Sequence, residues 1–328
     1  MEENSKKIAN ALNEYFVCIG PTLAEKLGQS QKSFDSYLKD SPISSFYISR
    51  TNENECCKVI DSFSNSRCEA LDKISPKLFK LGVKAMAKIL PKLINTCFSE
   101  GYFPNCLKIA KVTPIFKEGD SEERGNWRPI SIISCIAKLI EKLVKKRLLS
   151  FLKKHKILSD YQFGYRAKHS TTHAILNISE NILNNIENKK HTVSIFLDLS
   201  KGFDCVNHKI LLKKMHHYGI RGIALKFFES YLTNRRQQTF VNGVLSDPMI
   251  ILCGVPQGSV LGPLLFLLYT NDLENASKFL INLFADDTCL SMSHTNLNTL
   301  KRQCNMEAAL VDEWFRANKL TTNAKKSK

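Results

Sequence analysis

The sequence predicts an α+β fold, and three stretches of the chain carry that prediction. Residues 134–154 place their apolar side chains on one helical stripe and most of their basic side chains away from it, which predicts an amphipathic helix. Residues 191–198, HTVSIFLD, are apolar and β-branched without a helical period, which predicts a buried strand ending at Asp198. Residues 279–292 predict two strands joined by a turn that carries Asp286 and Asp287. A hairpin beside long helices indicates an antiparallel sheet packed on helices.

Length, charge and cysteine usage bound the class of protein. A chain of 328 residues is long enough for two or three subdomains. Its 47 Lys and Arg against 31 Asp and Glu leave a net charge of +16, which favours a polyanionic partner such as nucleic acid or an anionic membrane face, although dispersed lysines also serve solubility alone. Eleven cysteines without a C-x-x-C pair predict reduced thiols and an intracellular protein of the cytoplasm or nucleus.

The sequence predicts no membrane-spanning segment. The longest apolar stretch, VLGPLLFLLY, has 10 residues, whereas a membrane span needs about 20. The start, MEENSKK, is charged and does not resemble a signal peptide.

The first third of the chain predicts helices followed by a strand. Residues 1–27 have a helical period, and the Ser-, Asn- and Lys-rich stretch 29–56 is expected to be a linker. Residues 70–100 predict one or two helices, and AKVTPIF, residues 110–116, predicts a strand. An acidic loop over 119–125 then precedes the segment NWRPIS.

The remainder alternates helices with hairpins. Asn242-Gly243 is a strong turn signal, and a loop with several Gly and Pro residues, CGVPQGSVLGP, leads into an apolar helix that is expected to reach about residue 274. Further helices are predicted at 171–188, 207–217, 222–233 and 300–315.

Three carboxylates stand at the ends of predicted strands. If those strands are neighbours in one sheet, Asp198, Asp286 and Asp287 converge, and their mutual repulsion makes a divalent cation the natural partner. Mg²⁺ takes carboxylates and substrate phosphates as ligands, and a pair of metal ions can clamp both oxygens of an in-line phosphoryl displacement. The other reading, in which each aspartate caps a turn separately, stays open on these residues alone.

The order of the motifs resembles a known family. FLDLSKGFD, GVPQGSVLGP and FADDT closely resemble the palm motifs of reverse transcriptases from non-LTR (LINE-type) retrotransposons of the jockey-like group. KVTPIFKEGD, NWRPISIISCIAKLIEKLVKKRL and QFGYRAKHST resemble that family's fingers motifs, and WFRANKLTTNAKKSK resembles its later palm motif. EENSKKIANALNEYFVCIGPTLAEKL also resembles the segment that precedes the polymerase in such elements.

The resemblance implies a right-hand polymerase with a palm and mainly helical fingers. It implies an RNA-directed DNA polymerase, a nucleotidyltransferase that uses an RNA or DNA template, a primer and deoxynucleoside triphosphates. The implied division is a helical pre-polymerase segment and linker at 1–55, a helical N-terminal extension at 56–107, fingers at 108–190, and palm with part of the fingers at 191–328.

The resemblance also implies the catalytic residues. Asp198, Asp286 and Asp287 match the family's catalytic carboxylates. Asp198, Asp286 and the backbone carbonyl of Leu199 would hold two Mg²⁺ ions, with Mn²⁺ as an alternative, while Asp287 supports the site.

Five further residues match positions that contact the incoming nucleotide. Lys117 and Arg128 would hold the triphosphate, since an ammonium and a bidentate guanidinium suit phosphate oxygens. Phe203 matches the ring that excludes a ribose 2′-hydroxyl, and Gln257 with Gly258 matches the loop that packs on the nascent base pair. A solvated surface role for Lys117 and an ordinary core role for Phe203 are the alternatives.

The resemblance leaves the role of Asp204 and the activity of this chain open. Asp204 also matches the family motif, but a structural role is as well supported as a catalytic one. Elements of this kind carry an upstream endonuclease and continue into a thumb, so the chain is expected to be a truncated fragment that lacks both. An inactive remnant that binds nucleic acid through its basic surface is therefore the alternative function, and the oligomeric state is open.

Overall fold

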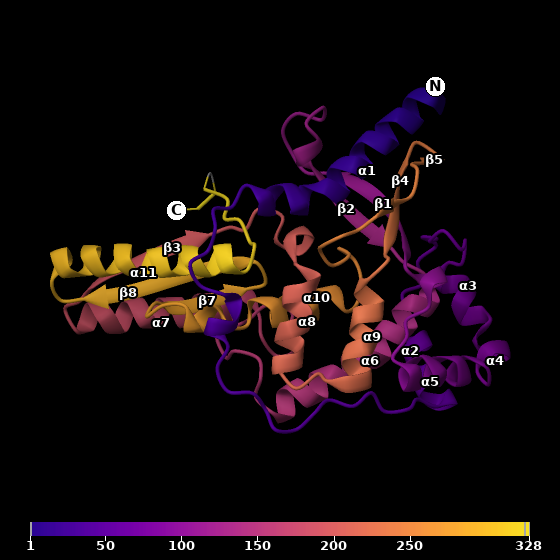
Figure 1. Cartoon of the computed structure of the whole chain (residues 1–328), viewed down its shortest axis with the longest axis horizontal. Helices are drawn as coiled ribbons and strands as arrows, with labels where there is room; N and C mark the ends of the chain where they lie inside the picture. Colours follow the sequence, from indigo (N-terminus) through magenta and orange to yellow (C-terminus); the bar gives the residue numbers. More distant parts are fainter. Residues whose placement is uncertain (1, 325, 328) are drawn as a thin grey trace.

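Two separate β-sheets organise the computed structural model, which describes residues 2–324, 326 and 327 (Figure 1). The five-stranded sheet is mixed: β1 pairs in parallel with β4, and its other pairings are antiparallel. Its strands are β2 (Trp127–Ile132), β1 (Ile109–Phe116), β4 (Arg236–Val241), β5 (Val244–Leu245) and, also paired with β4, β6 (Met249–Ile250). The antiparallel three-stranded sheet has the order β3 (His191–Leu197), β8 (Asp287–His294) and β7 (Leu280–Phe284).

Eleven α-helices surround the sheets in the part of the chain that the structure describes. They are α1 (Glu2–Glu25), α2 (Glu53–Asp61), α3 (Pro76–Leu81), α4 (Val83–Met86), α5 (Leu90–Glu100), α6 (Cys135–Lys154), α7 (Thr171–Glu187), α8 (His208–His217), α9 (Gly222–Leu232), α10 (Gly262–Thr270) and α11 (Leu297–Ala317). Short 3-10 turns cover Phe34–Tyr37, Asn105–Leu107, Arg124–Asn126, Gly202–Cys205 and Leu273–Asn275. The structure therefore confirms a mixed fold of helices and strands.

Most predicted helices are confirmed to within a few residues, and capping explains their starts. Ser134, Ser170, Asn207 and Asn296 each accept a backbone N–H from the first turn of α6, α7, α8 and α11 respectively. The predicted helix through about residue 274 instead ends at Thr270 and continues only as a 3-10 turn.

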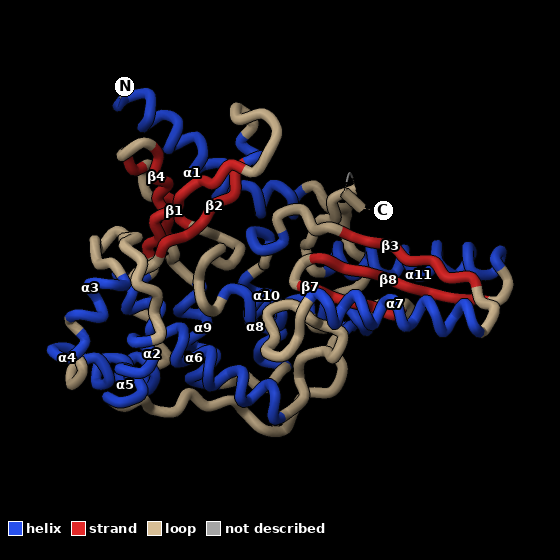
Figure 2. Tube along the Cα trace, turned by 180° about the vertical axis from the view of Figure 1, so that it is seen from behind, coloured by secondary structure: helices blue, strands red, loops and turns tan. Residues whose placement is uncertain are grey.

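The three-stranded sheet lies between two helices, with α7 on one side and α11 on the other (Figure 2). Residues paired across an antiparallel sheet share a face, so the row Ile195, Leu290 and Ile281 is one apolar layer of the core, the layer on the α11 side. The alternate row, which ends at Phe196, faces α7. The prediction of a buried strand at 191–198 was wrong in this respect: β3 is an edge strand, and the Phe196 side chain is 51% exposed.

Helix α1 packs on the five-stranded sheet. It runs along β4 (Figure 1). The buried amide of Asn13 donates to the Gln237 carbonyl at 3.4 Å, and its oxygen accepts from the Thr239 hydroxyl at 3.1 Å. Lys6 reaches the Asp247 carboxylate at 2.8 Å. These contacts fix the N-terminal helix on the sheet.

The stretch expected to be a linker is packed against the body of the fold. It has no long helix or strand before α2, yet Phe34, Tyr37, Phe46 and Ile48 are buried in the main hydrophobic core. The mostly polar composition of this stretch suggested a linker, but its few apolar side chains pack into the core.

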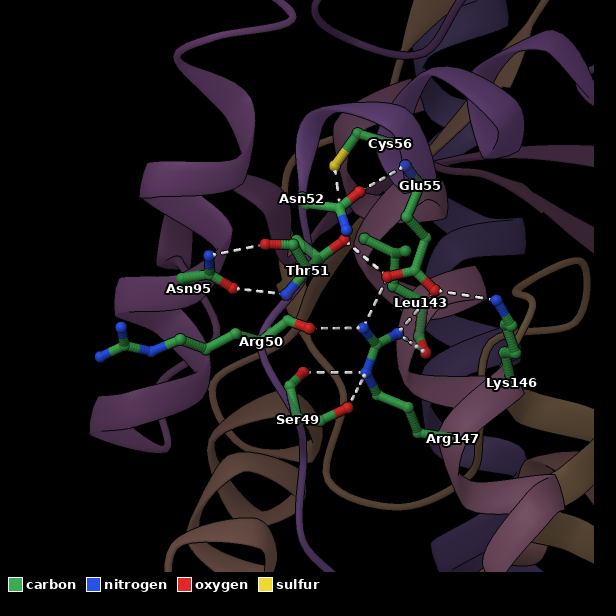
Figure 3. A network of polar contacts seen from close by, with 10 residues as sticks. All are labelled: Ser49, Arg50, Thr51, Asn52, Glu55, Cys56, Asn95, Leu143, Lys146 and Arg147. Atoms are coloured by element: carbon green, nitrogen blue, oxygen red, sulfur yellow. Dashed lines mark hydrogen bonds and ion pairs between the residues drawn. The ribbon is translucent and has the colours of Figure 1, made fainter.

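A polar network joins this N-terminal region to α6 (Figure 3). The Arg147 guanidinium donates to the Glu55 carboxylate, with the shortest contact at 2.6 Å, and to the backbone carbonyls of Ser49, Arg50 and Leu143. Every nitrogen of this nearly buried cation has an oxygen partner, so the charge is compensated where it is desolvated.

No helix in the described part of the chain is both long and apolar enough to cross a membrane. All eleven cysteines are free thiols.

Candidate active site

The tip of the β7–β8 hairpin carries the two adjacent aspartates. Phe284 pairs with Asp287, so Ala285 and Asp286 form the turn between the strands. Ala285 has a φ of 59°, in the left-handed region that a tight hairpin turn needs. Asp286 is half-buried and Asp287 is exposed. The sequence prediction of a hairpin with its carboxylates at the tip is confirmed.

The segment QFG, residues 162–164, holds this turn in place. The Gln162 side-chain oxygen accepts the backbone N–H of Ala285 at 3.1 Å and that of Gly164 at 2.7 Å. Phe163 donates its N–H to the Leu283 carbonyl at 2.7 Å. A Cβ at Gly164 would overlap the Ala285 backbone, so only glycine fits there. Gln162 is a site residue that the sequence reasoning missed.

Asp198 follows β3 and is brought to the same edge of the sheet. Leu197 pairs with Thr288, so Asp198 comes next to Asp287 across the ladder. Asn323 clamps it, because its side-chain amide donates to the Asp198 carboxylate at 3.1 Å and its backbone N–H donates to the Asp198 carbonyl at 2.8 Å. The strands that carry the three aspartates therefore belong to one sheet, as the convergence of the three carboxylates requires.

Like charges and burial act together on these carboxylates. Burial raises the pKa of Asp286, and the charge of Asp198 raises it further. Burial and the charge of Asp286 likewise raise the pKa of Asp287. A cation at this position would relieve that repulsion.

One cavity of about 810 Å³ is lined by all nine residues that the sequence predicted as catalytic, metal-binding or nucleotide-binding. They are Lys117, Arg128, Asp198, Leu199, Phe203, Gln257, Gly258, Asp286 and Asp287. The cavity wall also includes Tyr15, Ile19 and Leu23 of α1, which sequence reasoning did not associate with any site.

Lys117 and Arg128 come from the β1–β2 hairpin and line the same cavity as the carboxylates. Lys117 directly follows β1, and Arg128 pairs with Ile115 in the ladder. Burial lowers the pKa of Lys117, and the charge of Arg128 lowers it further, whereas Asp198 and Asp286 oppose that shift. Two cations so close together suit a polyanionic ligand.

Phe203 belongs to both the core and the cavity. Its ring stacks on Phe266 of α10 with centroids 4.5 Å apart and meets the Tyr165 ring edge-on at 6.1 Å. It is half-buried and lines the cavity, so its position is rigid while part of its surface faces the open volume.

Gln257 is oriented by Asp204, its neighbour from the 3-10 turn after β3. The Gln257 side-chain amide donates to both Asp204 oxygens, at 2.9 and 2.8 Å. Burial raises the pKa of Asp204 to about 6. Asp204 thus has a structural partner inside the fold, which accords with the structural alternative for this residue.

Gly258 is required by the protein's own backbone. Its φ is 106°, and a Cβ would lie 2.7 Å from the Ser131 carbonyl oxygen. This loop is therefore pressed against β2, which the Ser131 N–H reinforces by donating to the Gln257 carbonyl at 2.7 Å.

The donor set at the three carboxylates is made of oxygen atoms, which suits Mg²⁺ or Mn²⁺. Among the described residues, no three His, Cys, Asp or Glu side chains gather closely enough to hold a metal ion by themselves. Mg²⁺ commonly takes one or two protein carboxylates and completes its shell with water and substrate phosphates, so the residues present fit that ion.

Comparison with known proteins bears on this site. Residues 115–328 match the family model described as reverse transcriptase (RNA-dependent DNA polymerase). The chain is 30% identical to the probable RNA-directed DNA polymerase from transposon BS of Drosophila melanogaster, over 99% of this chain and 36% of that protein. It is 29% identical to the probable RNA-directed DNA polymerase from transposon X-element of the same species, over 92% of this chain and 34% of that protein.

A third relative is the RNA-directed DNA polymerase from mobile element jockey of Drosophila melanogaster, 28% identical over 79% of this chain and 29% of that protein. The chain thus spans about a third of the length of these curated relatives. The family match includes all nine predicted site residues, from Lys117 to Asp287, whereas Tyr15, Ile19 and Leu23 of the cavity wall lie outside it. The chain therefore belongs to the reverse transcriptase (RNA-dependent DNA polymerase) family.

Proposed function

We propose that this chain performs template-directed nucleotidyl transfer, adding a deoxynucleoside monophosphate to the 3′-hydroxyl of a primer on an RNA or DNA template. The observation that supports this most directly is that the three carboxylates, Lys117 and Arg128 all line one cavity. Such a cavity offers acidic ligands for metal ions and cations for a triphosphate.

Asp198, Asp286 and the Leu199 carbonyl would hold two Mg²⁺ ions, or Mn²⁺, with Asp287 as a supporting carboxylate. When bound, the metal ions would activate the primer hydroxyl and neutralise charge on the phosphates. Asn323 keeps the Asp198 carboxylate at the sheet edge, and Gln162 keeps the Asp286 turn closed. Both residues act in this proposal as positioning residues.

The remaining cavity residues are assigned to the nucleotide. Lys117 and Arg128 would hold the triphosphate, and the braced ring of Phe203 would lie against the sugar and exclude a 2′-hydroxyl. The loop of Gln257 and Gly258, fixed by Asp204 and Ser131, would support the nascent base pair.

In this proposal the three-stranded sheet and α11 belong to the palm, within 191–328, and part of the fingers lies in the same range. The fingers otherwise span 108–190, and 1–55 and 56–107 are N-terminal regions. The free thiols support an intracellular location.

The test is primer extension with oligo(dT) on poly(rA), with Mg²⁺ and dTTP, by the parent chain and by Asp286→Asn. Loss of one carboxylate removes several kcal/mol of charge stabilisation, so the rate should fall on the order of 10³-fold. Template-primer binding, measured at several salt concentrations, should persist in both proteins because it depends on cations that contact phosphates.

The matched control is Asp61→Asn, which neutralises an exposed aspartate at the end of α2, outside the cavity. It should extend the primer as the parent does. Equal extension by Asp286→Asn and the parent would contradict the assignment of the site. Salt-sensitive binding without extension by the parent would contradict the proposed activity of this chain.

A further inference from the structure

Lys201 lies in the loop that follows β3, three residues after Asp198, and its side chain reaches the β1–β2 hairpin. Its ammonium donates to the Gly125 carbonyl at 3.1 Å and to the Trp127 carbonyl at 3.3 Å. It therefore connects the loop after β3 with the end of the hairpin.

The two carbonyls belong to the part of the hairpin that carries the cations of the site. The Gly125 and Trp127 carbonyls flank Asn126, whose own carbonyl accepts the Lys117 N–H at 2.9 Å. Trp127 directly precedes Arg128 in β2. A single ammonium thus holds the segment from which both cations extend.

The other side-chain hydrogen bonds that the structure describes for residues 117–128 stay within the hairpin. The Asn126 amide donates to the Asp120 carbonyl, and the Trp127 indole donates to the Ser121 carbonyl, both at 2.9 Å. They shape the loop but do not join it to another element. Both cations of the hairpin are exposed, so their position depends on what fixes the hairpin.

The partners and the backbone of Lys201 are unusual for a residue that serves stability alone. It is half-buried, yet unlike Arg147 it forms no ion pair with a carboxylate of the described residues. Its φ of 53° lies in the left-handed region, which glycine adopts with less strain. It also lines the active-site cavity. Backbone strain at a cavity wall is typical of functional positions.

We propose that Lys201 is a positioning residue for the triphosphate of the incoming nucleotide. By tying the hairpin to the loop after β3, it holds Lys117 and Arg128 at a fixed place relative to the carboxylates before the ligand arrives. Such preorganisation improves affinity because the ligand does not have to order its own site. The inference rests on the proposed function for the identity of the ligand.

Hydrogen exchange of the ligand-free full chain tests the connection itself. Lys201→Met removes the ammonium and should speed exchange of the Lys117 amide, in a peptide spanning 115–128, at least about tenfold. Amides of α6 should exchange as in the parent, which separates local release of the hairpin from a general loss of stability. Unchanged exchange in the hairpin, or equally faster exchange in α6, would overturn the proposal.

Calorimetric titration with dTTP and Mg²⁺ tests the consequence for the ligand. The full chain is bound to poly(rA) with an oligo(dT) primer that ends in a dideoxynucleotide, so that no extension occurs. Lys201→Met should weaken dTTP binding at least about tenfold, equivalent to about 1.4 kcal/mol, with unchanged stoichiometry. A structural role alone would lower the stoichiometry and leave the dissociation constant unchanged, and that result would overturn the proposal.

Lys209→Met is the matched control for the loss of one positive charge. Lys209 is exposed on α8 and lies outside the cavity, so the variant should bind dTTP as the parent does. Equal weakening by the two variants would overturn the proposal by showing that net charge accounts for the effect.

Primer extension separates this inference from the proposed function. Lys201→Met should raise the KM for dTTP at least about tenfold, while kcat changes less than about threefold. A fall in kcat with an unchanged KM would overturn the positioning role, as would the absence of dTTP binding by the parent. If the parent binds dTTP but extends no primer, the proposed function fails and the binding result still decides the inference.

Lys201→Gly keeps the test decisive if Lys201→Met does not fold. Glycine adopts the left-handed conformation without strain and also lacks the ammonium, so the hairpin should exchange faster and dTTP should bind more weakly. Weaker binding with unchanged hairpin exchange would make Lys201 a direct ligand of the phosphates and would overturn the positioning role.

Discussion

The Glu55–Arg147 network stabilises the charged form of its carboxylate, whereas the Asp198–Asp286–Asp287 cluster destabilises the charged form of Asp286. In the network, the Arg147 guanidinium meets a carboxylate and several carbonyls, and each partner offsets the desolvation of the other (Figure 3). Burial opposes the charge of Glu55, but its hydrogen bonds, led by that from Arg147, lower its pKa to about 2. In the cluster, burial and like charges raise the pKa of Asp286.

The difference separates a contact that serves folding from one that serves a ligand. A chain optimised only for stability would pair its carboxylates with cations, as it does at Glu55. At the sheet edge, burial and like charges outweigh the nearby cations and raise the pKa of Asp286 and Asp287, which costs stability, and such sites are typical of function. Four changes test the comparison, in order of decreasing expected effect.

Breaking the compensated network should have the largest effect on stability. Arg147→Met leaves Glu55 and three carbonyls without their donor, so the free energy of unfolding should fall by about 3 kcal/mol in urea titration. Lys146→Met is the matched control, because Lys146 contacts the same carboxylate from a side chain that is 70% exposed. It should cost less than about 1 kcal/mol. Equal losses for the two variants would contradict the view that burial gives the network its strength.

Asp204 tests a partly buried carboxylate that forms no ion pair within the described part of the chain. Burial raises its pKa from 3.8 to about 6, so the folded state holds the proton more tightly than the unfolded chain does. That stabilisation is complete below pH 3.8 and is lost as the pH rises through about 6. The parent should lose at most about 3 kcal/mol over this interval, and Asp204→Asn should lose none of it. Chemical denaturation from pH 4 to pH 7 measures the slope; identical slopes would refute the assignment.

Glu55 should respond to acid in the opposite direction. Its folded pKa of about 2 lies below its ordinary value of 4.5, so its stabilisation is present above pH 4.5 and is lost as the pH falls toward 2. Solvent screening limits the effect to about 1 kcal/mol. Denaturation of Glu55→Gln between pH 5 and pH 2.5 should show a flatter acid decline than the parent. A steeper decline would mean that the carboxylate is not the stabilising form.

Asp287 should give the smallest change. In EDTA, Asp287→Asn removes one of three like charges and should raise stability by a few tenths of a kcal/mol, since the side chain is exposed. Thermal unfolding measures it, and added Mg²⁺ should reverse the order by favouring the parent. A less stable variant in EDTA would show that the carboxylate makes a favourable contact there.

The sequence predicted the elements whose signals are local. The FADDT turn lies between two apolar runs, so the hairpin and its aspartates could be located from about 14 residues, and the helix at 134–154 could be located from its apolar stripe. Whether β3 is central or at an edge depends on which strands pair beside it, and its apolar composition does not encode that. Its exposure was therefore predicted wrongly.

The residues that position the site could not be found locally because they act across the chain. Gln162 contacts a turn 123 residues away, and Asn323 contacts Asp198 across 125 residues. Tyr15 lines the cavity through the packing of α1 on the sheet, which depends on contacts such as that between Asn13 and Gln237. The sequence offered one local signal of their role, namely that Gln162 lies in QFGYRAKHST and Asn323 in WFRANKLTTNAKKSK, two segments that resemble family motifs.

The cavity wall combines residues that are far apart in the sequence, and this has a consequence for synthesis. The Thr321 hydroxyl donates to the Leu23 carbonyl across 298 residues, and Asn323 must be present before Asp198 is clamped. At roughly 5–20 residues per second, a ribosome needs roughly 15–60 seconds between making these two segments. During that interval α1 has emerged with a face that packs only on later strands, so nascent chains should depend on chaperones until Asn323 has also emerged.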